Sequence, residues 1–209
     1  MTRIHQNKYK IAFKYRKQFP DSVLDVSDSV FSCIADFTRR TENVRGIEFY
    51  ENTIPLSPNS SNKMDVFSIE NPEMMEFCFG AFSDAFFTGQ SGALIQHTEG
   101  VLFPSAGNGD CWIALLEIKD CKPGNAAKYN AAMKQKVINS KSEIIRRGVG
   151  TKKNVYYGIA SYPRKKLSFD DTIFNDLFEQ KELFKQTGVV FFAANSVVIH
   201  QKIIEPIFK

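Results

Sequence analysis

The chain has 209 residues, of which 43% are hydrophobic and 24% are charged, and its formal net charge is +4. This length fits one domain with a core large enough to need no disulfide or structural metal. Ordinary Gly and Pro contents exclude collagen-like and disordered chains. We expect a soluble cytoplasmic protein, because no apolar run could cross a membrane and the basic N-terminus lacks the apolar segment of a secretory signal.

In the first part of the chain, the sequence predicts two strands and a helix. Apolar and basic residues alternate over residues 8–16, which predicts a strand with a basic outer face. Helical spacing of apolar residues predicts a helix over 27–40 that ends in two arginines. A second strand is expected over 44–50. We expect these elements to dock on the rest of the protein, because the first strand has an apolar face that needs cover.

The whole chain, residues 1–209, is expected to form a single domain. Residues 52–63 are rich in Ser, Asn and Pro and show little periodicity, which is typical of a linker. This linker would join an N-terminal extension, residues 1–51, to a core formed by residues 64–209.

The core is expected to begin with a short strand near Met64 and a helix over 73–87 that is apolar on nearly all sides and therefore buried. Two strands follow, over 93–103 and 111–119. The Asn-Gly pair between them is the strongest hairpin signal in the chain.

Helices and strands then alternate to the end of the chain. We expect a helix over 125–147, a strand over 154–161, a helix over 169–186 and a strand over 188–200. This order predicts an α/β fold, with a mixed α+β sheet, in which strand 111–119 lies in the interior and helix 125–147 packs across one face.

The strand over 111–119 changes character along its length. Its body is apolar on both faces, but it ends in Glu117 and Lys119, which are two residues apart and point to the same face. Charges on a core strand are costly to bury unless they are paired or used. A carboxylate and an ammonium held side by side at a strand end can anchor a divalent metal and orient a water molecule. A simple ion pair at a sheet edge is the alternative.

The buried helix, the hairpin, the strand ending in Glu117 and the lysine-rich helix together resemble the PD-(D/E)XK nuclease superfamily. The resemblance covers about residues 73–161. It implies a restriction-endonuclease-like α-β-β-β-α-β core with helices on both faces, and magnesium-dependent cleavage of nucleic acid. Glu117 and Lys119 match the second acid and the lysine of this family, whereas its first acid has no unambiguous match.

Hairpin geometry narrows the choice of the first acid. A loop of three or five residues centred on Asn108 would pair position 117 with position 99 and place Glu99 beside Glu117. A two-residue turn would shift the register by one and send Glu99 to the other face. Asp84 is a further candidate metal ligand. Asp65 is weaker, Asp110 is too far along the strand unless the chain folds back, and Asp120 with Lys122 is a competing acid–lysine pair.

Basic side chains are concentrated in one part of the chain. Residues 117–166 contain thirteen basic residues and three acidic ones. Such a zone attracts polyanions, although ordinary solvated faces have the same composition. The candidate nucleic-acid-binding residues are Lys128, Lys134, Gln135, Arg146, Arg147, Lys152 and Lys153.

The sequence therefore favours a Mg²⁺- or Mn²⁺-dependent endonuclease that acts on DNA, with RNA as the other substrate. Glu99, Glu117 and Lys119 would be its catalytic residues, and Glu99, Glu117 and Asp84 its metal ligands. By analogy with the superfamily, antiviral defence or restriction is the expected role. The alternative is a catalytically inactive module of the same fold that binds nucleic acid or protein, with a homodimer or a partner subunit compatible with either function.

Overall fold

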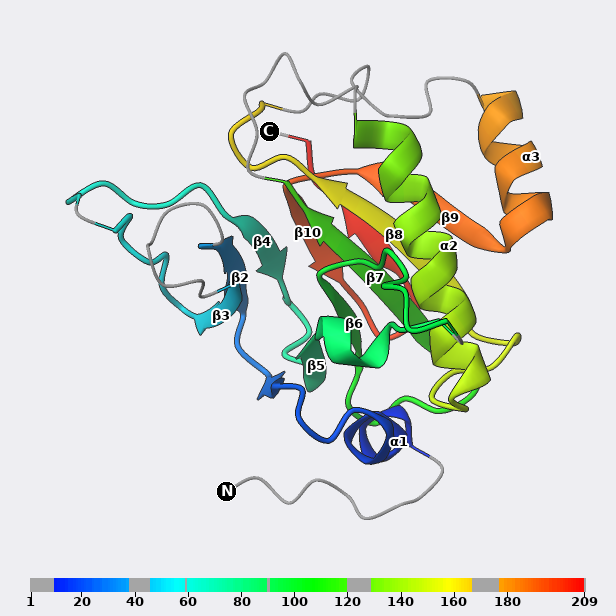
Figure 1. The fold of residues 1–209 in the computed structure, drawn as a ribbon. Coiled ribbons are helices and arrows are strands. Elements are labelled where there is room, and N and C mark those ends of the chain that lie inside the picture. The colour runs from blue at the N-terminus through cyan, green and yellow to red at the C-terminus, as the bar shows by residue number, and fades with distance from the viewer. Residues whose placement is uncertain are drawn as a thin grey trace.

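The computed structural model of this protein describes residues 10–37, 46–58, 60–89, 91–119, 129–166 and 177–208. The described chain forms two β-sheets and three α-helices (Figure 1). The helices are α1 (Ile11–Gln18), α2 (Asn130–Arg146) and α3 (Leu177–Thr187), with a short 3₁₀ helix, η1, at Asp84–Phe86. None of the described helices combines the length and the apolar character that a membrane span requires.

The larger sheet has six strands in the order β1-β5-β6-β7-β8-β9. They are β1 (Leu24–Ser27), β5 (Phe77–Ala81), β6 (Gly100–Pro104), β7 (Trp112–Ile118), β8 (Val155–Ser161) and β9 (Val189–Ala193). Strands β5, β6 and β7 are antiparallel neighbours, whereas β8 runs parallel to β7 and β9 parallel to β8. The prediction that β7 lies in the interior of a mixed sheet is confirmed, and every residue of β7 is buried.

The smaller sheet has five strands in the order β11-β10-β4-β2-β3. They are β2 (Phe31–Asp36), β3 (Ile47–Glu51), β4 (Phe67–Glu70), β10 (Ser196–Ile199) and β11 (Ile204–Pro206). The single strand predicted over 188–200 is therefore two strands, β9 and β10. The chain leaves the larger sheet after Ala193 and enters the smaller one at Ser196.

The elements form three layers. On one face of the larger sheet, Ile113 and Leu115 of β7 pack with Tyr15 of α1 and with Val137 and Ile144 of α2. Helix α3 packs against the same cluster. The alternate residues of β7 pack against the smaller sheet, which covers the opposite face. The expectation of helices on both faces is therefore wrong for the described residues, because the second sheet takes the place of one helical layer (Figure 1).

The prediction of a strand over residues 8–16 is also wrong, because most of the described part of this range forms helix α1. The buried residues of α1 are Ile11, Ala12 and Tyr15, which have helical spacing, whereas Phe13 is 37% exposed. Apolar residues at positions 11, 13 and 15 fit a period of two, but the same stretch also supplies one helical face. Packing against the larger sheet selects the helix.

The helices predicted over 27–40 and 73–87 are wrong as well. Strand β2 occupies the first range, and strand β5 with η1 occupies the second. Cys33, Ile34 and Ala35 are all fully buried, because β2 lies between two strands and packs on both faces. A strand buried on both faces is apolar throughout, so its sequence has no period that separates it from a buried helix.

The N-terminal residues complete both sheets. Strand β1 pairs with β5, and β2 pairs with β4. The strand predicted over 44–50 corresponds to β3, and the segment 52–63 runs from β3 toward β4 with an isolated bridge between Leu56 and Lys63. The predicted extension and the predicted core thus share both sheets.

Close packing at Gly158 of β8 gives a testable prediction. A Cβ added there would lie 2.7 Å from Phe191 and 2.9 Å from Val137, closer than real Cβ contacts. We expect Gly158→Ala to lower the free energy of unfolding by about 1–3 kcal/mol, measured by denaturant titration, because overpacking shifts β9 or α2. Gly109→Ala is the control, since its nearest neighbour would lie at 3.6 Å. Equal losses in the two variants would contradict this account.

Candidate active site

The end of β7 places a carboxylate inside the protein. Glu117 lies on the face of β7 that packs against the helices, together with Ile113 and Leu115. Only 2% of Glu117 is exposed. Its Oε1 accepts a hydrogen bond from Lys136 Nζ at 2.5 Å. Its Oε2 is buried and has no hydrogen-bond partner among the described residues. A half-satisfied buried carboxylate is costly for folding, which makes Glu117 a candidate for a functional role.

The β6–β7 hairpin brings a second carboxylate to this position. Gly100 pairs with Leu116, which is the register predicted from a loop centred on Asn108. One further step along this register places Glu99, the residue just before β6, opposite Glu117 and on the same face. The negative charge of Glu99 raises the pKa of Glu117, and only burial raises it more.

Burial and mutual repulsion shift both acids in the same direction. Burial, followed by the charge of Glu99, raises the pKa of Glu117 to about 7. Burial also raises the pKa of Glu99, and Asp36 at the end of β2 adds to this effect. Lys136 lowers the pKa of both acids. Asp36 and Lys136 were not among the residues predicted for the site.

Helix α2 fixes the segment that leads into Glu99. The side chain of Asn139 donates to the carbonyl of Gln96 at 2.7 Å, and the backbone N–H of Thr98 donates to Ser140 Oγ at 2.9 Å. Both Thr98 and Ser140 are fully buried. These bonds tie the segment just before β6 to α2 next to Glu99.

The spacing of α2 contains a signal for Lys136. This residue lies three positions after Met133 and four before Ser140, and both of these are buried against the sheet. A lysine at such a position faces inward, which is unfavourable unless its charge meets a partner. The sequence analysis considered the lysines of this helix only as surface contacts.

The other predicted site residues lie around this pair. The ammonium of Lys119 lies 5.2 Å from the centre of the Tyr129 ring, at the start of α2. Asp84 is exposed on η1, where its Oδ1 lies 2.8 Å from Nε2 of His97. His97 in turn lowers the pKa of Glu99. Asp84 therefore contacts His97, and within the described residues the structure does not bring Glu99, Glu117 and Asp84 together as a three-ligand metal site.

The remaining acids of the sequence analysis are placed differently. Asp110 precedes β7 and so lies at the opposite end of that strand from Glu117. Asp65 is exposed just before β4, in the smaller sheet. Asp120 and Lys122 lie outside the described residues.

Several of the predicted nucleic-acid contacts have partners within the protein. Arg146 and Arg147 both bind Glu143, and Arg147 also donates to the carbonyls of Gln18 and Phe86. Arg147 therefore ties α2 to α1 and η1. Lys134 binds Glu179 of α3 at 3.0 Å, and Gln135 donates to Asn139 on its own helix. Lys128 lies outside the described residues.

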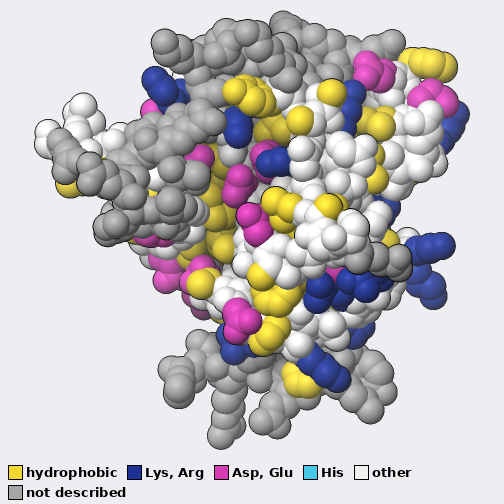
Figure 2. Space-filling view, in the orientation of Figure 1, with side chains coloured by type: hydrophobic (Ala, Val, Ile, Leu, Met, Phe, Trp, Pro, Cys, Tyr) yellow, Lys and Arg dark blue, Asp and Glu magenta, His cyan; other side chains and the backbone are white. Residues whose placement is uncertain are grey.

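Lys152 and Lys153 are exposed on the loop between α2 and β8. Asn154 ties this loop to the hairpin turn, because its Nδ2 donates to the carbonyls of Asn108 at 3.0 Å and Cys111 at 2.9 Å. The two lysines are thus presented by an anchored loop. In the space-filling view, Lys and Arg side chains gather near the C-terminal end of α2, and acidic side chains lie beside a basic one near the centre of the same face (Figure 2).

The donor set suits a hard divalent cation. No three His, Cys, Asp or Glu side chains within the described residues lie close enough together to hold a metal ion. Mg²⁺ in enzymes commonly binds one or two carboxylates and completes its shell with water and substrate phosphate. Glu99 and Glu117, whose Oε2 has no hydrogen-bond partner in the part of the chain that the structure describes, could supply these two carboxylates.

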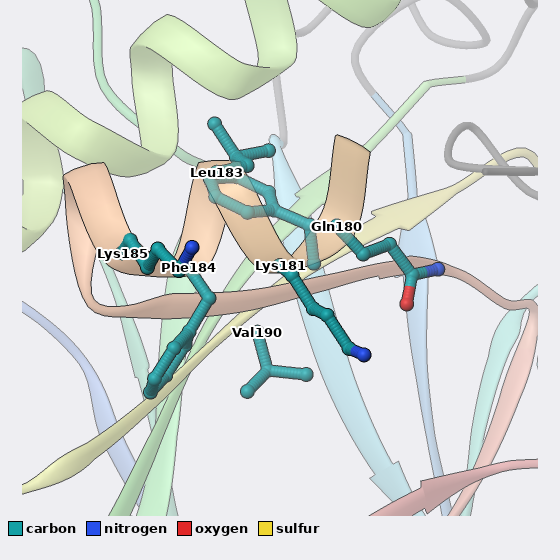
Figure 3. A pocket seen from close by; sticks show the side chains of 7 residues that line it. Gln180, Lys181, Leu183, Phe184, Lys185 and Val190 are labelled. Carbon is teal, nitrogen blue, oxygen red and sulfur yellow. The ribbon is translucent and has the colours of Figure 1, made fainter. Parts of the chain in front are cut away.

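A separate hollow of about 350 Å³ lies between α3 and β9 (Figure 3). Leu183, Phe184 and Val190 supply apolar lining, and Lys181 and Lys185 lie at the same hollow. Strand β8 separates β9 from β7 in the sheet, so this hollow is not part of the carboxylate site.

Comparison of the chain with protein-family models, with curated proteins and with solved structures gives no match.

Proposed function

We propose that this protein is a metal-dependent nuclease that hydrolyses phosphodiester bonds of DNA, with Glu99 and Glu117 as ligands of Mg²⁺ or Mn²⁺. The observation that carries the proposal is the buried Glu117 carboxylate, which is 2% exposed and, among the described residues, has an oxygen without a hydrogen-bond partner and a second acid that raises its pKa. A buried carboxylate beside a half-buried one, both with raised pKa values, is unfavourable for folding alone. A cation between them would remove this penalty.

A bound Mg²⁺ would lower the pKa of a coordinated water and offset the charge that develops on the scissile phosphate. The residues of the chain provide the surroundings for this chemistry. Glu99 and Glu117 supply hard oxygen ligands, and Lys119 supplies a positive charge for the water and the phosphate at the end of β7. Lys134, Lys152 and Lys153 would contact flanking phosphates, which position DNA without reading its sequence.

The order of elements supports the same proposal. Strands β5, β6 and β7, followed by α2 and β8, give β-β-β-α-β, and α1 comes before them in the chain and packs on the same sheet face as α2. The β-β-β-α-β part agrees with the α-β-β-β-α-β order that the resemblance to PD-(D/E)XK nucleases implies. The first helix of that order does not directly precede β5 in the described chain, because strands β1 to β4 lie between α1 and β5 in sequence.

The direct test is cleavage of plasmid DNA, single-stranded DNA and RNA with Mg²⁺ or Mn²⁺. We expect DNA to be cut with either metal and not with EDTA. Failure to cut any of the three substrates with either metal would reject the nuclease proposal. We infer a defence or restriction role only by analogy with the superfamily.

Phosphate contacts give a second prediction. Lys152→Glu should weaken binding to all DNA sequences alike and reduce the magnitude of the salt dependence, d log K/d log[salt], by about 1, because one phosphate contact is lost. The measurement is fluorescence anisotropy with Ca²⁺ in place of Mg²⁺. Lys202→Glu, an exposed lysine near β11, is the control. An unchanged salt slope in Lys152→Glu would remove this loop from the interface.

The second candidate function is a catalytically inactive module that binds nucleic acid or a partner protein. Two observations favour it: no group of three metal-binding side chains occurs within the described residues, and Lys136 already supplies a positive charge at Glu117. Calorimetry with Mn²⁺ separates the two functions. The nuclease should bind the ion, whereas the inactive module should bind DNA without it.

A further inference from the structure

Lys136 is a charged side chain that is largely removed from water. It borders the stripe of α2 that packs on the larger sheet, and only 22% of its side chain is exposed. Its ammonium donates to Glu117 Oε1 at 2.5 Å. A lysine removed from water in this way costs free energy unless its charge is paired or used. Glu117 is the partner that the structure provides.

Lys136 is a stronger counter-charge for the two acids than Lys119. At both Glu99 and Glu117, the charge of Lys136 has a larger effect than that of Lys119. Lys119 lies over the ring of Tyr129. The lysine that contacts the carboxylate therefore comes from α2 and not from the Glu-x-Lys strand.

Because of this contact, the two oxygens of the Glu117 carboxylate have different surroundings. Oε1 is held by Lys136, whereas Oε2 is buried without a partner among the described residues. We propose that Lys136 is a positioning residue: it fixes the carboxylate through Oε1, so that Oε2 is the oxygen presented to the divalent cation. This inference rests on the proposed nuclease function. Partners that orient metal ligands typically change activity or metal affinity about 10–100-fold when they are removed.

Steady-state cleavage of DNA tests the positioning role. Lys136→Met should lower kcat about 10–100-fold and leave KM for DNA within about threefold, because Lys136 acts through Glu117 and not on DNA. Lys136→Arg should recover much of the loss, because it restores a cation that can hold Oε1. Lys185→Met is the matched control, since Lys185 is also ion-paired, with Glu182 at 2.6 Å, but lies on α3.

Two results would overturn the inference directly. Wild-type kcat in Lys136→Met would show that Glu117 needs no fixing. A rise in KM with unchanged kcat would show that Lys136 contacts the phosphate backbone of DNA.

Thermal unfolding tests the Lys136–Glu117 contact without any cleavage. In a double-mutant cycle, the effects of Glu117→Gln and Lys136→Met should depart from additivity by about 2–4 °C, whereas those of Glu117→Gln and Lys119→Met should depart from it less, because Lys119 has the smaller effect on Glu117. Additive effects for Glu117 and Lys136 would overturn the inference, even in an active enzyme. Coupling in a protein that cuts no nucleic acid would reject the proposed function and keep Lys136 as the residue that holds Glu117.

Discussion

Glu117→Gln is expected to abolish Mg²⁺-dependent cleavage of DNA while leaving DNA binding intact or tighter. The substitution keeps the shape of the side chain but removes the charge that holds the cation. We expect the rate to fall at least about a thousandfold, because a bound metal supplies several kcal/mol of transition-state stabilisation. DNA binding should not weaken, because a negative charge near the phosphates is lost. Cleavage kinetics and anisotropy with Ca²⁺ measure the two effects.

The control for this experiment is Glu205→Gln, which changes an exposed acid on β11, in the smaller sheet. It should cut DNA at the wild-type rate. If Glu117→Gln cuts as well as the wild type, the site lies elsewhere. Asp120 with Lys122 then becomes the next acid–lysine pair to test.

The stability of the protein is expected to fall as the pH rises from about 4.5 to about 7. Glu117 has a pKa of about 7 in the folded protein, against 4.5 for an ordinary glutamate. Between these values the folded state keeps a proton that the unfolded state has lost, so stability decreases with pH and levels off above pH 7. A shift of this size corresponds to about 3 kcal/mol. Denaturant unfolding at pH 5 and pH 8 measures the difference.

Glu117→Gln should remove most of this dependence, because the amide does not ionise. Glu205→Gln should keep it. Mg²⁺ at pH 8 should raise the unfolding temperature of the wild type and of Glu205→Gln, but not that of Glu117→Gln, because the ion binds the ionised pair only in the folded state. The same pH dependence in Glu117→Gln and the wild type would show that another group titrates.

The local sequence was sufficient for the centre of the larger sheet. The apolar run of β7 predicted an interior strand, and the Asn108-Gly109 turn signal predicted the hairpin. The sequence left two registers open, and the structure has the one expected from a loop centred on Asn108, which sets Glu99 opposite Glu117. Turn geometry and side-chain alternation are short-range properties, so they can be read from neighbouring residues.

The sequence alone could not separate strand from helix where an element is buried on both faces. Strand β5 was predicted as part of a helix because its continuous apolar residues carry no period, and β2 because apolar residues in and around it happen to have helical spacing. Helix α1 was predicted as a strand, because Ile11, Phe13 and Tyr15 fit a period of two, although the face that the helix buries is Ile11, Ala12 and Tyr15. In each case the neighbouring element, and not the local pattern, decides the structure.

By itself, the sequence determined a mixed sheet with an acid and a lysine at the end of its central strand. Only the tertiary structure decided which lysine reaches Glu117, because Lys136 is 19 residues away along the chain and meets it only when α2 packs on β7. The tertiary structure also replaced one expected helical layer with a second sheet. These features depend on contacts between distant segments, whose geometry no local spacing contains.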